Sequence, residues 1–111
     1  MFIATNRLFV SPDQSEEFEA LFRNNMNSYL AGVKGLRRST LLRPVSAEHP
    51  YVSINEFDSE DDFRAWVVSD SFKQAHARNR GIARNVTGNV VETFQVAEDL
   101  VLVEGDSAFH G

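Results

Sequence analysis

The stretch FIATNRLFV, residues 2–10, begins the pattern that predicts the fold. Its side chains alternate as in a β-strand, and one face is more apolar than the other. Asn6 is the exception on the apolar face, where an amide costs on the order of 1–3 kcal/mol unless it is hydrogen-bonded. Asn6 is therefore either bonded to a neighbouring backbone or helix end, or aimed as a donor at a ligand. The apolar face consists of Phe2, Ala4, Asn6, Leu8 and Val10.

The segments that follow have the periodicity of further helices and strands. Asp13 and Glu16 have capping-box spacing and precede apolar residues that recur at helical spacing up to Gly32. Ser59 is predicted to cap a second helix, which begins with acidic residues. The expected strands are 36–43, 51–57 and 89–97, with 100–104 as a candidate fifth strand.

The order strand, helix, strand, strand, helix, strand is typical of the ferredoxin-like βαββαβ fold of the α+β class. Its antiparallel sheet carries both helices on one face. Apolar side chains, among them Ile3, Phe9 and Phe94, are expected on the other face, which predicts that a second sheet packs there. A homodimer that forms a dimeric α/β barrel is the simplest source of that sheet. We expect one domain over residues 1–105 and a flexible tail at 106–111.

Composition excludes several classes of protein. The net charge of -5 argues against a nucleic-acid binder, because phosphate affinity depends on clustered Lys and Arg. No run approaches the ~20 apolar residues that cross a bilayer, and the first residues lack the features of a signal peptide. Without cysteine, the chain has no disulfide framework and no thiolate metal site. We expect a cytoplasmic protein that binds neither membrane nor nucleic acid.

The stretch WVVSDSFKQAH, residues 66–76, places one indole and one imidazole in a segment that otherwise resembles core. Three short polar residues at 69–71 predict a break where the helix is capped again, because such side chains compete for backbone hydrogen bonds. Phe72 and His76 are four residues apart and share a helical face. The imidazole is therefore expected to follow the phenyl ring toward the sheet.

A lone helical histidine is more often a surface or core residue than a ligand, but the surroundings of His76 favour a ligand role. Neutral imidazole is a common protein ligand of haem iron. Residues 71–91 contain no acid, and their cations are suited to haem propionates, although a solvated face is the alternative. The arginines among these cations are Arg78, Arg80 and Arg84.

Phe63 and Trp66 precede Phe72 by more than one helical turn. They are expected to contact a macrocycle from its apolar side. The alternative for Trp66, the only tryptophan, is that it merely fills the core. Together with Phe72, these aromatic residues are candidate haem-binding residues.

Three motifs carry a resemblance to a known family. The sequence resembles the IsdG-type haem-degrading monooxygenases at three places. These are the motif NRL at 6–8, the motif LLRPV at 41–45 and the spaced set of Trp66, Phe72 and His76. These enzymes belong to the wider antibiotic biosynthesis monooxygenase superfamily. The similarity covers roughly residues 2–97, and Asn6, Trp66 and His76 align with the three functional positions of the family. Lys34-Gly35-Leu36 and Phe57 depart from the common family pattern.

The resemblance implies a homodimer that binds one haem per subunit as both cofactor and substrate. It assigns His76 as the proximal iron ligand, Trp66 as the residue that distorts the ring, and Asn6 as a hydrogen-bond partner on the distal side. With O2 and an electron donor, such an enzyme opens the porphyrin and releases iron.

Two alternatives stand beside this interpretation. The first is a cofactor-independent quinol or polyphenol monooxygenase of the same superfamily, in which His76 is a base or substrate anchor. The second is not an enzyme but a haem-binding or haem-transferring module, or a small dimerisation domain.

Overall fold

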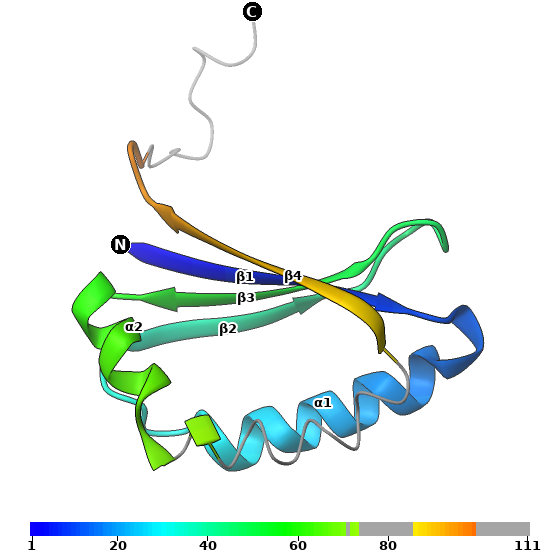
Figure 1. The fold of residues 1–111 in the computed structure, drawn as a ribbon, viewed down its shortest axis with the longest axis horizontal. Coiled ribbons are helices and arrows are strands. Elements are labelled where there is room, and N and C mark those ends of the chain that lie inside the picture. Colours follow the sequence, from blue (N-terminus) through cyan, green and yellow to red (C-terminus); the bar gives the residue numbers. More distant parts are fainter. Residues whose placement is uncertain (71, 74–85, 100–111) are drawn as a thin grey trace, which may run out of the picture.

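The computed structural model describes residues 1–70, 72–73 and 86–99, and its element order is the predicted βαββαβ (Figure 1). The candidate strand at 100–104 and the expected tail at 106–111 lie outside the described residues. The elements are β1 (Phe2–Val10), a short 3-10 turn (Pro12–Gln14), α1 (Ser15–Tyr29), β2 (Leu36–Leu42), β3 (Tyr51–Phe57), α2 (Glu60–Val67) and β4 (Val86–Gln95).

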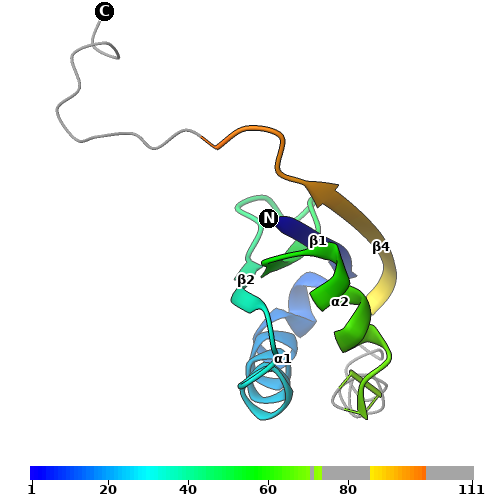
Figure 2. The same cartoon turned by 90° about the vertical axis from the view of Figure 1, so that its left-hand side faces the viewer.

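The four strands form one sheet in the order β2-β3-β1-β4, in which every neighbouring pair is antiparallel. Both helices lie on the same face of this sheet (Figures 1 and 2). The predicted hairpin is present as the β2–β3 pair. The ferredoxin-like fold is thus confirmed.

Two local predictions were wrong. Asp13 and Glu16 do not form a capping box: the chain first makes a 3-10 turn at Pro12, and α1 follows Gln14, whose side chain makes no capping bond. Proline suits this start because its φ is fixed and it has no N–H to satisfy. The second error is in β4, which begins at Val86 rather than residue 89, because pairing with β1 continues past Gly88 through a register shift.

Large side chains occupy both ends of the helix-facing side of the sheet, and small or polar ones occupy its middle. In the β1–β3 register Phe2 lies opposite Phe57, and Leu8 lies opposite Tyr51. At one end the rings of Phe2 and Phe63 pack 5.1 Å apart, centre to centre. At the other end Leu8 and Tyr51 form a core with Phe18 of α1. The middle of the sheet therefore lacks the bulk that fills its ends.

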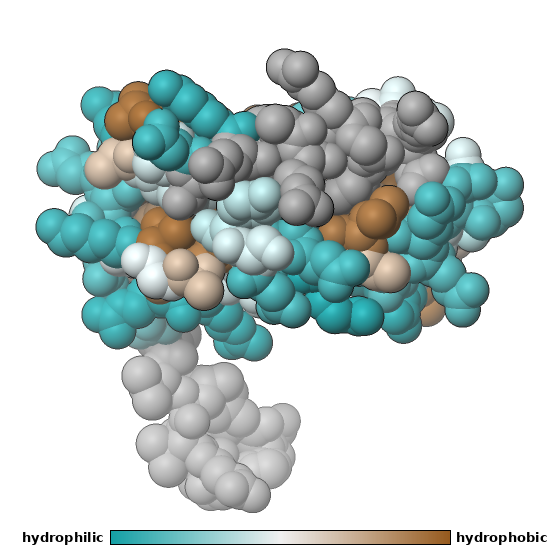
Figure 3. All heavy atoms as spheres, turned by 90° about the horizontal axis from the view of Figure 1, so that it is seen from below, coloured by the Kyte–Doolittle hydropathy of each residue, from teal (hydrophilic) through white to brown (hydrophobic). Residues whose placement is uncertain are grey.

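The opposite face of the sheet carries exposed apolar side chains. Phe9, Val90 and Phe94 are 39%, 45% and 50% exposed, and the strand register places them on the side away from the helices. Arg7 and Glu92 form an ion pair on the same face, 2.9 Å apart. Seen from the helix side, the described surface is mostly hydrophilic with several separate hydrophobic patches (Figure 3). The predicted apolar outer face is confirmed.

A charged network fastens α1 to the sheet. Arg43 donates two hydrogen bonds to the Glu19 carboxylate, at 2.7 and 2.6 Å, and the Tyr51 hydroxyl donates a third at 2.5 Å. The bonds from Arg43 and then Tyr51 lower the pKa of Glu19 from 4.5 to about 2. Burial, followed by the bond to Glu19, raises the pKa of Tyr51.

Glu19→Gln is expected to lower the thermal stability of the protein at neutral pH. It is also expected to make that stability less dependent on pH in the acid range. The pKa of Glu19 is lower in the folded chain, so its stabilising contribution is present above 4.5 and is lost as pH falls toward 2. Thermal melts from pH 7 to 2 are the measurement. The difference in melting temperature between wild type and variant should shrink in that window; a constant difference would contradict the network.

Candidate functional site

A cavity of about 340 Å³ lies between the middle of the sheet and the two helices. The sheet can form it because Ala4 lies opposite Asn55, and Asn6 lies opposite Ser53, in the centre of the β1–β3 pair. The helices supply larger side chains. The described lining comprises Ala4, Thr5, Asn6, Ser53, Asn55, Asn89 and Val91 from the sheet, Phe22, Asn25, Met26 and Leu30 from α1 and its end, Phe63, Trp66 and Val67 from α2, and Phe72.

The sheet side of this cavity is polar but uncharged. The Asn89 amide donates to the Oδ1 atom of Asn6 at 3.3 Å. The Ser39 hydroxyl donates to the Oδ1 atom of Asn55 at 2.6 Å. Among the described residues that line the cavity, none has an ionisable side chain. This surface therefore offers amide and hydroxyl hydrogen bonds at any ordinary pH.

The helix side of the cavity is mostly apolar and contains an aromatic cluster at and just after α2. Trp66 and Phe72 meet edge to face with ring centres 4.8 Å apart, and Trp66 also packs 5.7 Å from Phe57. The Nε1 atom of Trp66 is buried and has no hydrogen-bond partner in the described part of the chain. Such an atom is uncommon, because burying an indole N–H without a hydrogen bond costs free energy.

Two serines determine how these rings are held. Ser59 caps α2 as predicted, since its Oγ accepts from the Asp62 N–H at 3.2 Å. After α2 ends, Ser69 donates to the Trp66 carbonyl at 2.6 Å and accepts from the Phe72 N–H at 3.2 Å. At the predicted break, Ser69 is thus hydrogen-bonded to the backbone of both ring-bearing residues, and residues 70, 72 and 73 are again helical.

The structure brings four of the sequence-predicted site residues together around one cavity. These are Asn6, Phe63, Trp66 and Phe72. The remaining predicted residues, His76, Arg78, Arg80 and Arg84, lie outside the described residues.

Sequence reasoning missed the other polar residues of the cavity. Ser53 and Asn55 of β3 and Asn89 of β4 face the same space as Asn6. A usable indication for β3 was its alternation, in which Ser53 and Asn55 separate two large aromatic residues on one face. Asn89 had no such indication, because its partner becomes clear only once β4 is paired with β1.

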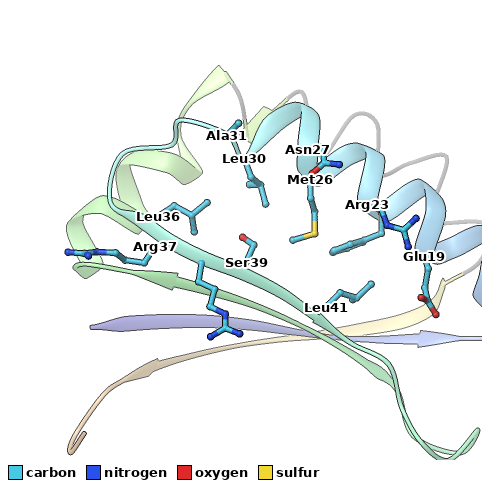
Figure 4. A pocket seen from close by; sticks show the side chains of 12 residues that line it. Glu19, Arg23, Met26, Asn27, Leu30, Ala31, Leu36, Arg37, Ser39 and Leu41 are labelled. Carbon is cyan, nitrogen blue, oxygen red and sulfur yellow. The ribbon is translucent and has the colours of Figure 1, made fainter. Parts of the chain in front are cut away.

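A separate hollow of about 550 Å³ lies between α1 and the edge strand β2 (Figure 4). The side chains of Met26, Leu36 and Leu41 point into it, and Glu19 and Arg23 lie at one end (Figure 4). None of the sequence-predicted site residues lines it.

In the described ranges, no three His, Asp or Glu side chains gather as a metal site. Neither α1 nor α2, the helices described here, has the length and apolarity to cross a membrane.

The fold and this cavity agree with the family that the chain matches. The model of the antibiotic biosynthesis monooxygenase family matches residues 1–78. The chain belongs to this family.

Curated relatives narrow the class further. A protein of Staphylococcus saprophyticus is 29% identical over 105 residues, which cover 90% of this chain and 99% of the relative. A protein of Staphylococcus epidermidis is 33% identical over 82 residues, which cover 73% and 77%. Both are named heme oxygenase (staphylobilin-producing). The predicted class, a monooxygenase of the IsdG type, is confirmed.

Solved structures support the same fold. A mutant of MhuD with two manganese protoporphyrin IX molecules per active site is 26% identical with a TM-score of 0.77, and the match covers 91% of this chain and 99% of MhuD. A mutant of SnoaB, a cofactor-independent oxygenase of Streptomyces nogalater, is 24% identical with a TM-score of 0.72, covering 89% and 95%. At this identity, the likeness to SnoaB concerns the fold alone.

Proposed function

We propose that this protein binds haem in the cavity between the sheet and the helices and degrades it with O2 and an electron donor, releasing iron. The observation that carries the proposal is the two-sided cavity: an aromatic wall at Trp66 and Phe72 faces a neutral amide surface at Asn6. The aromatic wall matches a flat apolar macrocycle. The amide surface matches a polar ligand bound on the face of the macrocycle that is turned away from that wall. The named relatives support the same substrate.

The residues of this chain would divide the work of binding and orientation. His76 would hold the iron, and Arg78, Arg80 and Arg84 would pair with the propionates. Asn6 would donate a hydrogen bond on the opposite side, and the aromatic wall would exclude water. When bound, haem itself would supply the oxidative chemistry.

The cofactor-independent alternative requires a general base near the substrate. The described lining has no ionisable side chain, so on that alternative the base would have to come from elsewhere, such as His76. A haem titration distinguishes the two proposals. We expect a defined Soret complex with one haem per subunit, together with quenching of the fluorescence of Trp66, the only tryptophan. A chain that forms no such complex would favour the alternative.

Trp66→Phe is expected to retain haem but to slow its degradation roughly tenfold or more, because a smaller ring imposes less distortion, and strain of this kind is worth ~1–5 kcal/mol. Phenylalanine keeps most of the contact with Phe57 and Phe72. Resonance Raman out-of-plane modes should report a flatter macrocycle in the variant. An unchanged rate and spectrum would assign Trp66 to the core alone.

We further propose that two copies of this chain pair through the outer faces of their sheets. The exposed Phe9, Val90 and Phe94 supply the apolar centre that such an interface needs. Phe94→Asp is expected to produce monomers in sedimentation experiments, because an unpaired charge would be buried in the contact. Val45→Asp is the matched control, since Val45 is fully exposed in a loop. A dimeric Phe94→Asp protein would contradict this interface.

A further inference from the structure

Asn89 is a polar residue of β4 whose side chain is hydrogen-bonded to Asn6. In the β1–β4 register Asn89 lies opposite Leu8, and Val91 lies opposite Asn6. Asn89 therefore lies diagonally from Asn6, two residue pairs along the strands and on the same face of the sheet. Its Nδ2 atom donates to the Oδ1 atom of Asn6 at 3.3 Å.

This bond engages the oxygen of the Asn6 amide and leaves its NH2 group available to the cavity. A carboxamide has one accepting oxygen and one NH2 group with two donors, and the two orientations have nearly the same shape. Only hydrogen bonds distinguish them. With its oxygen bonded to Asn89, Asn6 keeps its NH2 group for a ligand.

The oxygen of a second amide at the cavity, that of Asn55, is engaged in the same way. The oxygen of Asn55 accepts from the Ser39 hydroxyl at 2.6 Å. In both pairs a residue on the next strand engages the carbonyl oxygen, so Asn6 and Asn55 keep their NH2 groups for the cavity. This arrangement suits a ligand whose cavity-facing atoms accept hydrogen bonds.

We propose that Asn89 is a positioning residue that holds the Asn6 amide with its NH2 group toward the cavity. The proposal rests on the proposed function, in which Asn6 donates to a group on the distal side of haem. The orientation itself is a property of the protein without haem and can be measured there.

Nuclear magnetic resonance of the 15N-labelled, haem-free protein tests the orientation. Asn89→Asp keeps the side-chain shape but offers only acceptors above a pH of roughly 4, so Asn6 should turn its NH2 group toward the new carboxylate. The Asn6 side-chain NH2 resonances should then shift, and acidification through the pKa of the carboxyl should reverse the shift. Asn89→Ala should shift them without that pH dependence.

Thr93→Ala is the matched control, because Thr93 is on the same strand and face but does not line the cavity. Asn6 resonances that respond to Thr93→Ala as much as to the Asn89 variants, or to none of them, would overturn the proposal. Thermal melts of each variant establish that it is folded.

A second measurement uses haem-loaded protein with carbon monoxide as the probe. Loss of one hydrogen-bond donor toward the distal side should weaken carbon monoxide binding roughly two- to tenfold in haem-loaded Asn89→Asp, relative to haem-loaded wild type. Unchanged carbon monoxide affinity would overturn the proposal that Asn89 positions Asn6 for a ligand on the distal side of haem. Failure of the wild type to bind haem would instead overturn the proposed function, and the haem-free resonances would still decide the orientation of Asn6.

Discussion

His76→Ala is expected to weaken haem binding on the order of 100-fold and to abolish the defined Soret complex. The proposed iron bond is made by this imidazole, and loss even of groups that merely orient a metal ligand costs 10- to 100-fold in affinity. Haem titration followed in the visible spectrum and by Trp66 fluorescence measures the effect.

His49→Ala is the control for this variant. His49 borders a hollow next to Glu19 and Arg43, away from the cavity that contains Asn6. Its removal should leave haem affinity unchanged. A His76→Ala protein with the wild-type spectrum and affinity would remove the iron-ligand assignment.

Asn6→Ala is expected to keep haem but to lose turnover on the order of 100-fold. The proposed donor acts on the distal side, and removal of one preorganised donor from a reaction site typically has an effect of this size. The haem affinity should change little because the aromatic wall and the proposed iron ligand remain. Single-turnover decay of the Soret band, compared with haem affinity for the same protein, is the measurement.

Thr93→Ala provides the matched comparison, since it shortens a polar side chain on the same sheet face outside the cavity lining. Equal losses of turnover in Thr93→Ala and Asn6→Ala would indicate a general disturbance of the sheet. Wild-type turnover in Asn6→Ala would return Asn6 to a structural role, as a partner of Asn89.

Most of the fold was predictable because its elements bury one face and so repeat every two residues or every turn. Strand 51–57 and the cap at Ser59 are examples whose local pattern agrees with the structure. The start of β4 was not predictable, because Gly88 resembles a loop residue until pairing with β1 supplies its hydrogen bonds.

The site could be predicted only where a residue conflicts with its local pattern. Asn6 does so, as a polar residue on an apolar face, and Trp66 is conspicuous as the only indole. Ser53 and Asn89 resemble ordinary polar strand residues, because nothing local indicates that they face a cavity. Their role depends on strand register, which arises from contacts between distant parts of the chain.

Incubation of the haem-loaded protein with O2 and ascorbate, with catalase present to remove free peroxide, tests whether the protein degrades haem. We expect that the Soret band decays in wild type, that iron is released to a chelator, and that the decay is slowed in Asn6→Ala. A defined haem complex whose Soret band persists under these conditions would contradict the claim of haem degradation and would indicate a haem carrier.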